Sequence, residues 1–362
     1  MSLESSTDLM QDGIVPGDHN QPIAVPRSTV KLSIVILCWN DRRVIADCLR
    51  SIFETTHSTE LEVIVSDNGS TDGSIEFLRS VYPAVRVIEN GRNLRFAKGN
   101  NVGIEASRGE YILILNPDTI IHNDTLDKIV SYADRHPEAG AFGCRVLNPD
   151  GSYQVSGRPA ASFRNEWIAA LYLRGLGRLH QWFTADSYPG WRGTSERQVD
   201  WVSGCFILVR GALLKSLGGF DEQFFYYYED MDLCRRIGQA GYPILYSPDA
   251  TITHLGGQST KTRFPALSFV LDGQVTRYLY YRKYFGNRGL RRARRIALTS
   301  AAIRWLGYRV MGAMRPSEAL KKRVEHLSAL MEWQWRVDPV RLVENGEEPE
   351  LRMKLTGRVA ER

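Results

Sequence analysis

The chain has 362 residues, 43% of them hydrophobic and 24% charged, which is enough for one large α/β domain with additions or for two domains. No uncharged apolar run approaches the roughly 18 residues that a membrane-spanning helix needs. The polar stretch before Arg27 lacks the basic and apolar parts of a secretory signal. The sequence therefore excludes these two classes and predicts a cytoplasmic protein.

The formal net charge is +5, and the basic residues are concentrated toward the C-terminal end. Thirteen Lys or Arg stand between Arg282 and Arg323 against one acidic residue, Glu318. Such a block is typical of segments that meet phosphates, acidic lipid or nucleic acid. The five cysteines form no CxxC pair and show no zinc spacing, so we expect buried free thiols in a reducing compartment.

Strands and helices alternate in the first third of the chain. Residues 1–30, rich in Ser, Asp, Gly and Pro, are predicted to be a disordered lead-in. The predicted strands are Leu32–Cys38, Leu61–Ser66, Val85–Ile88 and Tyr111–Leu115, and the predicted helices are Val44–Phe53, Gly73–Ser80 and Ala97–Ser107. Such an alternation favours right-handed βαβ crossovers and a parallel sheet, in which ligands bind beyond the carboxyl ends of the strands.

The pattern changes after residue 140. Residues 151–198 are rich in Trp, Tyr, Arg and Gly and are predicted to form a long loop or small helices over a cleft. A strand is expected over Val199–Arg210, followed by a short helix, and a last short strand over Thr251–His254. From about residue 265 the pattern is helical, with basic residues interleaved among apolar ones.

Polar side chains follow three of the predicted strands. They are Cys38, Trp39 and Asn40 after the first, Asp67, Asn68 and Gly69 after the second, and Asn116 and Asp118 after the fourth. Asp67 could accept a hydrogen bond from the imide nitrogen of uracil or thymine, with an Asx-turn as the alternative. Asp118 could bind a divalent cation that bridges a diphosphate, with an amide oxygen from Asn116, and a Pro-Asp turn is its alternative.

Three further residues extend this polar group. Asn93 and Lys98 stand at a predicted helix start, which suits phosphate or ribose contact, although capping explains at least one asparagine there. His254 ends an apolar strand; a lone histidine is usually structural there, but it could complete the shell of a cation. The chain has neither GxGxxG after its first strand nor GxxxxGK[ST], so a nucleotide must be held in another way.

An acidic pair follows the aromatic run Phe224–Tyr228 and opens a helix. At about 100° per residue, Asp230 shares a face with the apolar Leu233 and is predicted to point inward from the first turn. Asp232 is expected on the opposite face, where it can pair with Arg235 or Arg236, three or four residues later. The alternative role for Asp230 is an acidic residue stabilised by the helix N-terminus.

The motifs described above occur, together with several others, in an order that resembles family 2 of the inverting glycosyltransferases, over roughly residues 31–260. The matching segments are 33–40 (SIVILCWN), 65–73 (VSDNGSTDG), 93–103 (NLRFAKGNNVG), 115–119 (LNPDT), 201–205 (WVSGC), 218–225 (GGFDEQFF) and 229–236 (EDMDLCRR), followed by His254. The asparagine-rich third segment and the Asn-Pro-Asp form are similar to the rhamnosyltransferase-like branch.

The resemblance implies a GT-A fold over residues 31–262, a Rossmann-like, mostly parallel sheet flanked by helices. Its nucleotide-binding half would be 31–120 and its acceptor half 140–262, with a helical basic region from 263 to 362. It implies a nucleotide-diphosphate sugar donor, for which dTDP-rhamnose is expected. The acceptor would be a glycan or polyprenyl-linked hydroxyl in cell-envelope polysaccharide synthesis.

The resemblance also implies a role for each site residue. Asp230 would be the general base, with Glu229 as second choice, and Asp118 and His254 would hold Mg²⁺ or Mn²⁺. The residues implied to bind the nucleotide sugar are Cys38, Trp39, Asn40, Asp67, Asn68, Gly69, Asn93, Lys98, Asn116 and Asp118. Trp201, Ser203 and Gly204 would line the acceptor side.

The chain departs from many relatives in one motif, because Asn116-Pro117-Asp118 stands where they carry a DxD with two carboxylates. A weaker hold on the metal is therefore expected. A transferase with a UDP-hexose or galactofuranose donor and a non-catalytic glycan-binding module are the alternative functions. Retention of both Asp118 and Asp230 argues against the binding module.

The basic C-terminal region indicates the surface at which the protein would bind its acceptor. Its arginines alternate with residues such as Leu290, Ile296, Trp305, Leu306 and Tyr308, a composition that suits a helix lying on an anionic membrane surface. A peripheral position at the inner face of the cell membrane is therefore expected. A solvated basic helix or a contact between copies of the chain is the alternative, and no base-reading motif indicates nucleic acid.

Overall fold

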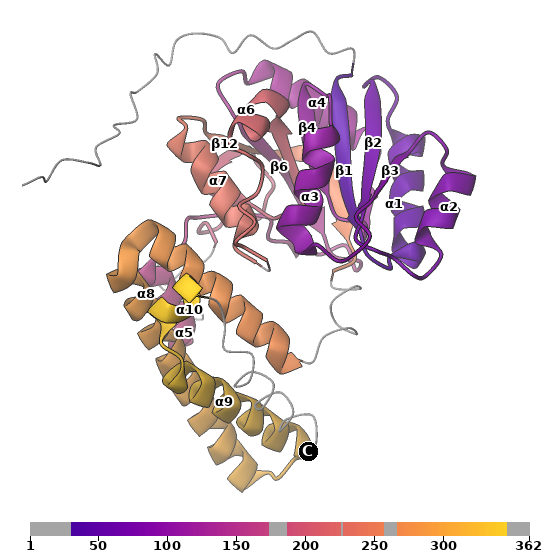
Figure 1. The fold of residues 1–362 in the computed structure, drawn as a ribbon. Coiled ribbons are helices and arrows are strands. Elements are labelled where there is room, and N and C mark those ends of the chain that lie inside the picture. Colours follow the sequence, from indigo (N-terminus) through magenta and orange to yellow (C-terminus); the bar gives the residue numbers. More distant parts are fainter. Residues whose placement is uncertain (1–29, 174–186, 226, 257–265, 346–362) are drawn as a thin grey trace, which may run out of the picture.

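The computed structural model describes residues 30–173, 187–225, 227–256 and 266–345 (Figure 1). The predicted lead-in lies almost wholly outside the described residues, as does Tyr226 of the aromatic run. Among the described residues, no helix combines the length and the hydrophobicity that crossing a lipid bilayer requires.

The first part of the chain forms the predicted alternation of strands and helices. Its elements are β1 (Leu32–Cys38), α1 (Arg42–Thr55), β2 (Leu61–Asp67), α2 (Ser74–Val81), β3 (Arg86–Glu89), α3 (Arg95–Ala106), β4 (Tyr111–Leu115), β5 (Thr119–Ile121), α4 (Thr125–Arg135) and β6 (Ala141–Leu147). The central strands β1 and β4 are continuous apolar runs, as suits strands covered on both faces. The seven elements predicted up to residue 115 are present, and β5 and β6 add two strands that were not predicted.

The second part contains shorter strands. Its elements are β7 (Tyr153–Gln154), β8 (Gly157–Arg158), α5 (Phe163–Ala170), β9 (Arg197–Val199), β10 (Trp201–Val202), β11 (Phe206–Arg210), α6 (Gly211–Ser216), α7 (Glu229–Gln239) and β12 (Ile244–His254). The single strand expected over Val199–Arg210 is wrong, because the chain turns at Gly204 and Cys205 between β10 and β11. The last strand is also longer than expected, because β12 pairs with β6 on both sides of a register shift between Ser247 and Thr251.

The main sheet has the strand order β3-β2-β1-β4-β11-β6-β12-β5, with β7 beside β6 and β9 beside β12. From β3 to β4 neighbouring strands are parallel, and β11 runs antiparallel to both of its neighbours. Helices α1, α2 and α4 cover one face, while α3, α6 and α7 cover the other. Because β1, β2 and β4 are parallel, the loops that follow them meet at one edge, the lower edge of the sheet in Figure 1.

Three helices follow the sheet: α8 (Ala266–Met314), α9 (Glu318–Arg336) and α10 (Pro339–Asn345). Helix α8 bends at Gly286, whose φ of 63° and ψ of −170° are accessible almost only to glycine. Its first segment packs Tyr280 and Tyr281 against Phe224, next to α7. Its second segment forms a hairpin with α9 around a separate core that includes Trp333. The hairpin lies beyond the lower edge of the sheet (Figure 1).

Candidate active site

The loops after β1 and β2 are tied together by hydrogen bonds. The N–H of Asn40 donates to Ser70 Oγ at 2.8 Å, and Asn40 Oδ1 accepts from the N–H of Thr71 at 2.6 Å. Asn40 has a φ of 56°, in the left-handed region that Asn tolerates better than most residues. Cys38 is fully buried, which raises the pKa of its thiol to about 12, whereas Trp39 stays partly exposed. The two predicted donor-binding loops thus form one connected rim.

Asp67 has one carboxylate oxygen that is bonded and one that is not. Its Oδ2 accepts the N–H groups of Gly69 and Ser70, each at 2.9 Å, which is the expected Asx-turn. Its Oδ1 is buried and has no hydrogen-bond partner. A buried acceptor left without a donor costs on the order of 1–3 kcal/mol, so a ligand that donates to it would be stabilised. The turn and the base-binding hypothesis are therefore compatible, on different oxygens of one side chain.

Asn68 and Asn93 are bonded to each other at the start of α3. Asn68 Nδ2 donates to Asn93 Oδ1 at 3.3 Å and to the carbonyl oxygen of Arg95 at 3.2 Å. Asn93 Oδ1 also accepts the N–H of Arg95 at 2.7 Å. Capping and loop contacts thus account for these bonds. Lys98 is exposed and forms an ion pair with Glu222 at 3.3 Å.

The pairing of β5 with β12 brings Asp118 beside His254, because Thr119 lies opposite His254 in the sheet. Asp118 Oδ1 is 3.2 Å from His254 Nε2, and Asn116 Nδ2 is 3.5 Å from the same nitrogen. On the other side of the ring, His254 Nδ1 is 3.0 Å from Gln154 Oε1. Asp118 is buried and His254 partly buried, so this pair faces little bulk water.

This arrangement fits a divalent cation. When His254 Nδ1–H donates to Gln154, the neutral ring presents a lone pair at Nε2 toward the carboxylate of Asp118. Two acceptors then face each other unless a proton or a cation lies between them. A second hydrogen bond that orients the ring is usual for metal-ligating histidines. The described part of the chain places no group of three or more His, Cys, Asp or Glu to hold a metal. A cation here would complete its shell with diphosphate or water oxygens.

Asp230 stands in the first turn of α7, and each of its carboxylate oxygens accepts one backbone N–H. Oδ2 accepts from Gly204 at 3.0 Å and Oδ1 from Met231 at 2.7 Å. Burial raises the pKa of Asp230 above its ordinary value, although these N–H groups and the positive charge of Arg158 oppose the rise. The carboxylate is therefore a stronger base than that of an exposed aspartate.

Glu229 precedes Asp230 and is the more deeply buried of the two. Its Oε2 is buried without a hydrogen-bond partner. Burial, together with the neighbouring charge of Asp230, holds the pKa of Glu229 well above its usual range. Tyr227 and Tyr228 have φ values of 62° and 68°, a strained conformation for residues other than glycine. Such strain costs on the order of 1–3 kcal/mol and is concentrated at functional loops.

The dipeptide Gly204-Cys205 connects the two predicted carboxylates. Gly204 donates its N–H to Asp230, and the carbonyl oxygen of Cys205 accepts the N–H of Asn116 at 3.1 Å. Burial raises the pKa of the Cys205 thiol to about 12, and the negative charges of both Asp118 and Asp230 add to the rise. Asp118 and Asp230 therefore border the same two residues, as a single site requires.

Trp201 and Ser203 lie next to this dipeptide. Trp201 Nε1 donates to the carbonyl oxygen of Pro159 at 3.0 Å, and the guanidinium of Arg158 lies 5.6 Å from its ring centre. The N–H of Ser203 donates to a carbonyl of the neighbouring loop at 2.9 Å. Trp201 and Met231, the residue after Asp230, border a cavity of about 690 Å³. Ser203, Gly204 and Asp230 do not line this cavity, and the predicted acceptor side adjoins the predicted base through the hydrogen bond from Gly204 to Asp230.

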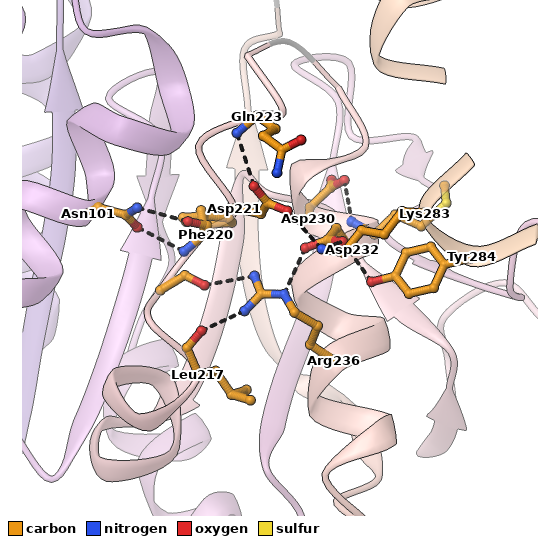
Figure 2. A network of polar contacts seen from close by, with 12 residues as sticks. Asn101, Leu217, Phe220, Asp221, Gln223, Asp230, Asp232, Arg236, Lys283 and Tyr284 are labelled. Atoms are coloured by element: carbon orange, nitrogen blue, oxygen red, sulfur yellow. Dashed lines mark hydrogen bonds and ion pairs between the residues drawn. The ribbon is translucent and has the colours of Figure 1, made fainter. Parts of the chain in front are cut away.

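Asp232 is the buried centre of a polar network between α7 and α8 (Figure 2). The prediction that it lies on the outer face of α7 is wrong, because α8 covers that face and leaves Asp232 0% exposed. Its Oδ1 accepts from Lys283 Nζ at 2.6 Å and from the Tyr284 hydroxyl at 2.7 Å. Its Oδ2 accepts from Arg236 Nε at 2.8 Å, which confirms the predicted pairing with a following arginine.

The same network fixes the loop before α7. Lys283 Nζ also donates to Asp221 at 2.8 Å. Arg236 donates to the carbonyl oxygens of Leu217 and Gly219 at 2.9 and 2.7 Å. A single group of charges thus joins α7, α8 and the chain that leads into the aromatic run.

The aromatic run divides into buried and exposed rings. Phe224 is buried beside α8, so core packing accounts for it. Phe225 is partly buried and lies under the guanidinium of Arg95, 4.3 Å from its ring centre. Tyr227 is 51% exposed, which makes it the most exposed of the described rings in this run.

Comparison with known sequences gives the family. Residues 33–196 match the sequence model of the family described as Glycosyl transferase family 2. The N-acetylglucosaminyl-diphospho-decaprenol L-rhamnosyltransferase of Mycobacterium tuberculosis (strain ATCC 25618 / H37Rv) is 35% identical over 212 residues, which cover 55% of this chain and 68% of that protein. The chain belongs to glycosyltransferase family 2. The predicted family and the predicted enzyme class are confirmed.

Two further similarities concern a second relative and the fold of this glycosyltransferase. Rhamnosyltransferase WbbL of Escherichia coli (strain K12) is 28% identical over 207 residues, 54% of this chain and 74% of that protein. The mannosyltransferase PcManGT from Pyrobaculum calidifontis, solved in complex with GDP-Man and Mn²⁺, aligns with 94% of this chain and 90% of its own, with a TM-score of 0.51 and 17% identity. The structural likeness shows the GT-A fold, as predicted.

Some residues of the glycosyltransferase site carry no signal in the sequence. Gln154 and Arg158 belong to the irregular stretch after residue 150, where no periodicity indicates which side chain points inward. The basic block predicts positive charge, but it does not predict that Lys283 turns into the protein to meet Asp232. The contacts of Gln154 with His254 and of Lys283 with Asp232 join positions far apart in the chain, so a local sequence pattern does not predict them.

Proposed function

We propose that this glycosyltransferase is an inverting rhamnosyltransferase. It would move rhamnose from dTDP-rhamnose to a hydroxyl of a polyprenyl-diphosphate-linked glycan in cell-envelope polysaccharide synthesis. The names of two relatives support the sugar, and the name of the mycobacterial relative supports a lipid-linked acceptor. The observation that carries the proposal is the convergence of Asp67, Asp118 and Asp230 at one edge of the sheet.

The donor would lie across the loops after β1, β2 and β4. Asp67 Oδ1, buried and without a partner, would accept the imide N–H of the thymine base. The diphosphate would lie next to Asp118 and His254, which would hold Mg²⁺ or Mn²⁺ between them. When bound, the cation supplies positive charge that stabilises the diphosphate leaving group.

Asp230 would act as the general base. It would take the proton from the acceptor hydroxyl as that oxygen bonds to the anomeric carbon of the donor. The bond from this carbon to the diphosphate oxygen breaks in the same step, so the configuration inverts and dTDP leaves. The raised pKa of Asp230 suits this role, and general-base catalysis contributes about 10²–10⁴-fold to the rate.

Two backbone N–H groups would keep the base in position. Gly204 and Met231 each bind one carboxylate oxygen of Asp230, and each oxygen retains a lone pair for the acceptor hydroxyl. Glu229 is the second candidate for the base, because it is also buried and its pKa is raised further. The acceptor would approach past Trp201, Ser203 and Gly204.

A donor screen tests the proposal. The full chain is heated with dTDP-rhamnose, UDP-glucose, UDP-N-acetylglucosamine or UDP-galactofuranose, each with and without Mn²⁺, and the unfolding temperature is measured. We expect the largest rise with dTDP-rhamnose and Mn²⁺. Transfer to a short prenyl-diphosphate-linked N-acetylglucosamine is then followed by mass spectrometry. Stabilisation and transfer with a UDP-sugar alone would replace the proposed donor, and no transfer with any donor would overturn the acceptor class.

A further inference from the structure

The second segment of α8 carries a stripe of exposed apolar side chains. Ile303, Leu306, Val310 and Met314 are 38%, 59%, 52% and 79% exposed. At about 100° per residue they fall within an arc of about 80°, so they form one face over successive turns. Scattered exposed apolar residues are ordinary, but a continuous apolar face marks an interaction surface. These four residues are called the α8 stripe below.

The α8 stripe does not hold the hairpin together, because the opposite side of the helix does. Trp305 donates its indole N–H to Ser328 of α9 at 2.9 Å, and Arg323 of α9 lies over the ring of Tyr308. Leu290 and Ile296, which belong to the same apolar pattern, are buried in the protein and are therefore not part of an exposed face. The periodicity predicts an amphipathic helix but does not tell which of its two apolar faces is free.

Arginines flank the α8 stripe on both sides. On an ideal helix Arg309 lies about 60° beyond Leu306, and Arg304 lies about 80° beyond Met314 on the other side. The sequence has no acidic residue between Asp272 and Glu318. The positive charge around the stripe is therefore not balanced by carboxylates of its own segment.

The neighbouring surface of α9 is also mostly apolar, with Glu332 and Arg336 at its border. Trp335, 77% exposed, borders a groove of about 670 Å³ with Leu298 and Ala302 of α8. An exposed tryptophan with an apolar body and an N–H donor is the residue type enriched at the boundary between lipid and water. The free apolar surface thus extends across the hairpin.

We infer that the α8 stripe docks on an anionic lipid bilayer. An apolar face bordered by arginines suits a helix lying in the plane of the membrane, with side chains among the acyl chains and guanidinium groups on anionic headgroups. A second copy fits less well, because face-to-face packing would bring the flanking arginines together, and the segment that carries them has no acidic residue to pair with them. The hairpin lies beyond the edge of the sheet where the candidate site is built, so a docked bilayer would lie toward that side (Figure 1).

The inference goes beyond the proposed reaction and is tested without donor or acceptor. The full chain is floated with vesicles of phosphatidylcholine alone or mixed with phosphatidylglycerol. We expect binding only to the mixed vesicles, with at least a tenfold loss when salt is raised to about 1 M. Leu306→Glu/Val310→Glu should reduce binding at least tenfold, and Arg304→Gln/Arg309→Gln should reduce it severalfold.

A matched control separates a docking face from a general effect of added charge. Val81 of α2 is 53% exposed, close to the 52% of Val310, so Val81→Glu should leave vesicle binding and folding unchanged. Circular dichroism and the unfolding temperature show that each variant is folded. Equal flotation of the wild type and Leu306→Glu/Val310→Glu, or no binding to phosphatidylglycerol, would overturn the inference. A dimer that this double variant abolishes, without vesicle binding, would identify a second copy as the occupant.

Discussion

The two sides of the candidate active site are held by contacts of different range. On the nucleotide side, Asp67 bonds to backbone groups two and three residues away, and Asn40 bonds across to the next loop. On the catalytic side, α7 is held by Lys283 and Tyr284, which come from a helix after the sheet. The loops proposed to bind the donor are thus held by the sheet itself, whereas the position of the proposed base depends on the C-terminal region.

The largest effect is expected when Asp230, the proposed base, is replaced. Asp230→Asn keeps the size of the side chain but removes its basicity, so kcat should fall about 10²–10⁴-fold with little change in donor affinity. Single-turnover kinetics and donor titration measure the two quantities. Glu229→Gln is the matched control and should lower kcat far less. If the two variants exchange these outcomes, Glu229 is the base.

Breaking the contacts of the catalytic side, which join residues far apart in the chain, should destabilise the protein. Asp232→Asn removes the charge that Arg236 and Lys283 share, and it should lower the free energy of unfolding by about 3–5 kcal/mol, as for other broken buried ion pairs. Urea denaturation measures this. Glu222→Gln breaks the exposed pair with Lys98 and should cost less than about 1 kcal/mol. Equal costs for the two variants would contradict the difference between buried and exposed contacts.

Lys283→Met tests whether α8 positions the base. Asp232 keeps Arg236 and Tyr284 in this variant, so the fold should survive. We expect kcat to fall about tenfold while the KM for the donor stays within about twofold, since α7 would lose its fixed position but the donor loops would not. Lys283→Arg should restore part of kcat. A change confined to the KM for the donor would assign Lys283 to the nucleotide side.

Disturbing the nucleotide side, where Asp67 is held by contacts with residues close in the chain, should affect donor binding alone. Asp67→Asn replaces one acceptor oxygen by a donor group, which either breaks the Asx-turn or faces the thymine N–H with another donor. We expect the dissociation constant for the donor to rise about tenfold or more, the equivalent of about 1.4 kcal/mol. Calorimetric titration measures it. Asp150→Asn changes an exposed Asx-turn with a similar bond to Ser152 and should have no effect on the donor.

The smallest expected effect is a change with pH in the free energy of unfolding. The pKa of Glu229 is raised in the folded protein, so the folded state holds a proton that the unfolded chain releases at lower pH. This stabilising contribution is complete below the ordinary glutamate range and is lost as pH rises through the raised pKa. Glu229→Gln should therefore stabilise the protein more at pH 8 than at pH 4, as measured by urea denaturation. A constant difference across this range would show that Glu229 is not buried as a neutral acid.

The difference in sequence separation between the contacts of the two sides also explains what could be predicted from the sequence. Asp67 and Asp118 follow apolar strand runs, so their place at the edge of the sheet is read directly from local pattern. Helical periodicity places Asp230 and Asp232 on opposite faces of α7. It gives no information about α8, which covers the face of α7 that carries Asp232 and buries this residue. The length of β12 escapes prediction because Ser247 to Asp249 interrupts its apolar run.

The bend at Gly286 has a mechanical consequence. Three residues before it, Lys283 donates a hydrogen bond to Asp232 of α7, the helix that carries the proposed base, and the α8 stripe begins about five turns after it. A methyl group at position 286 would meet no neighbour within 4 Å, so an alanine is opposed by the backbone angles rather than by space. The angle at this one glycine therefore sets how the proposed base, held beside the first segment of α8, is oriented relative to the proposed lipid-docking face on the second segment.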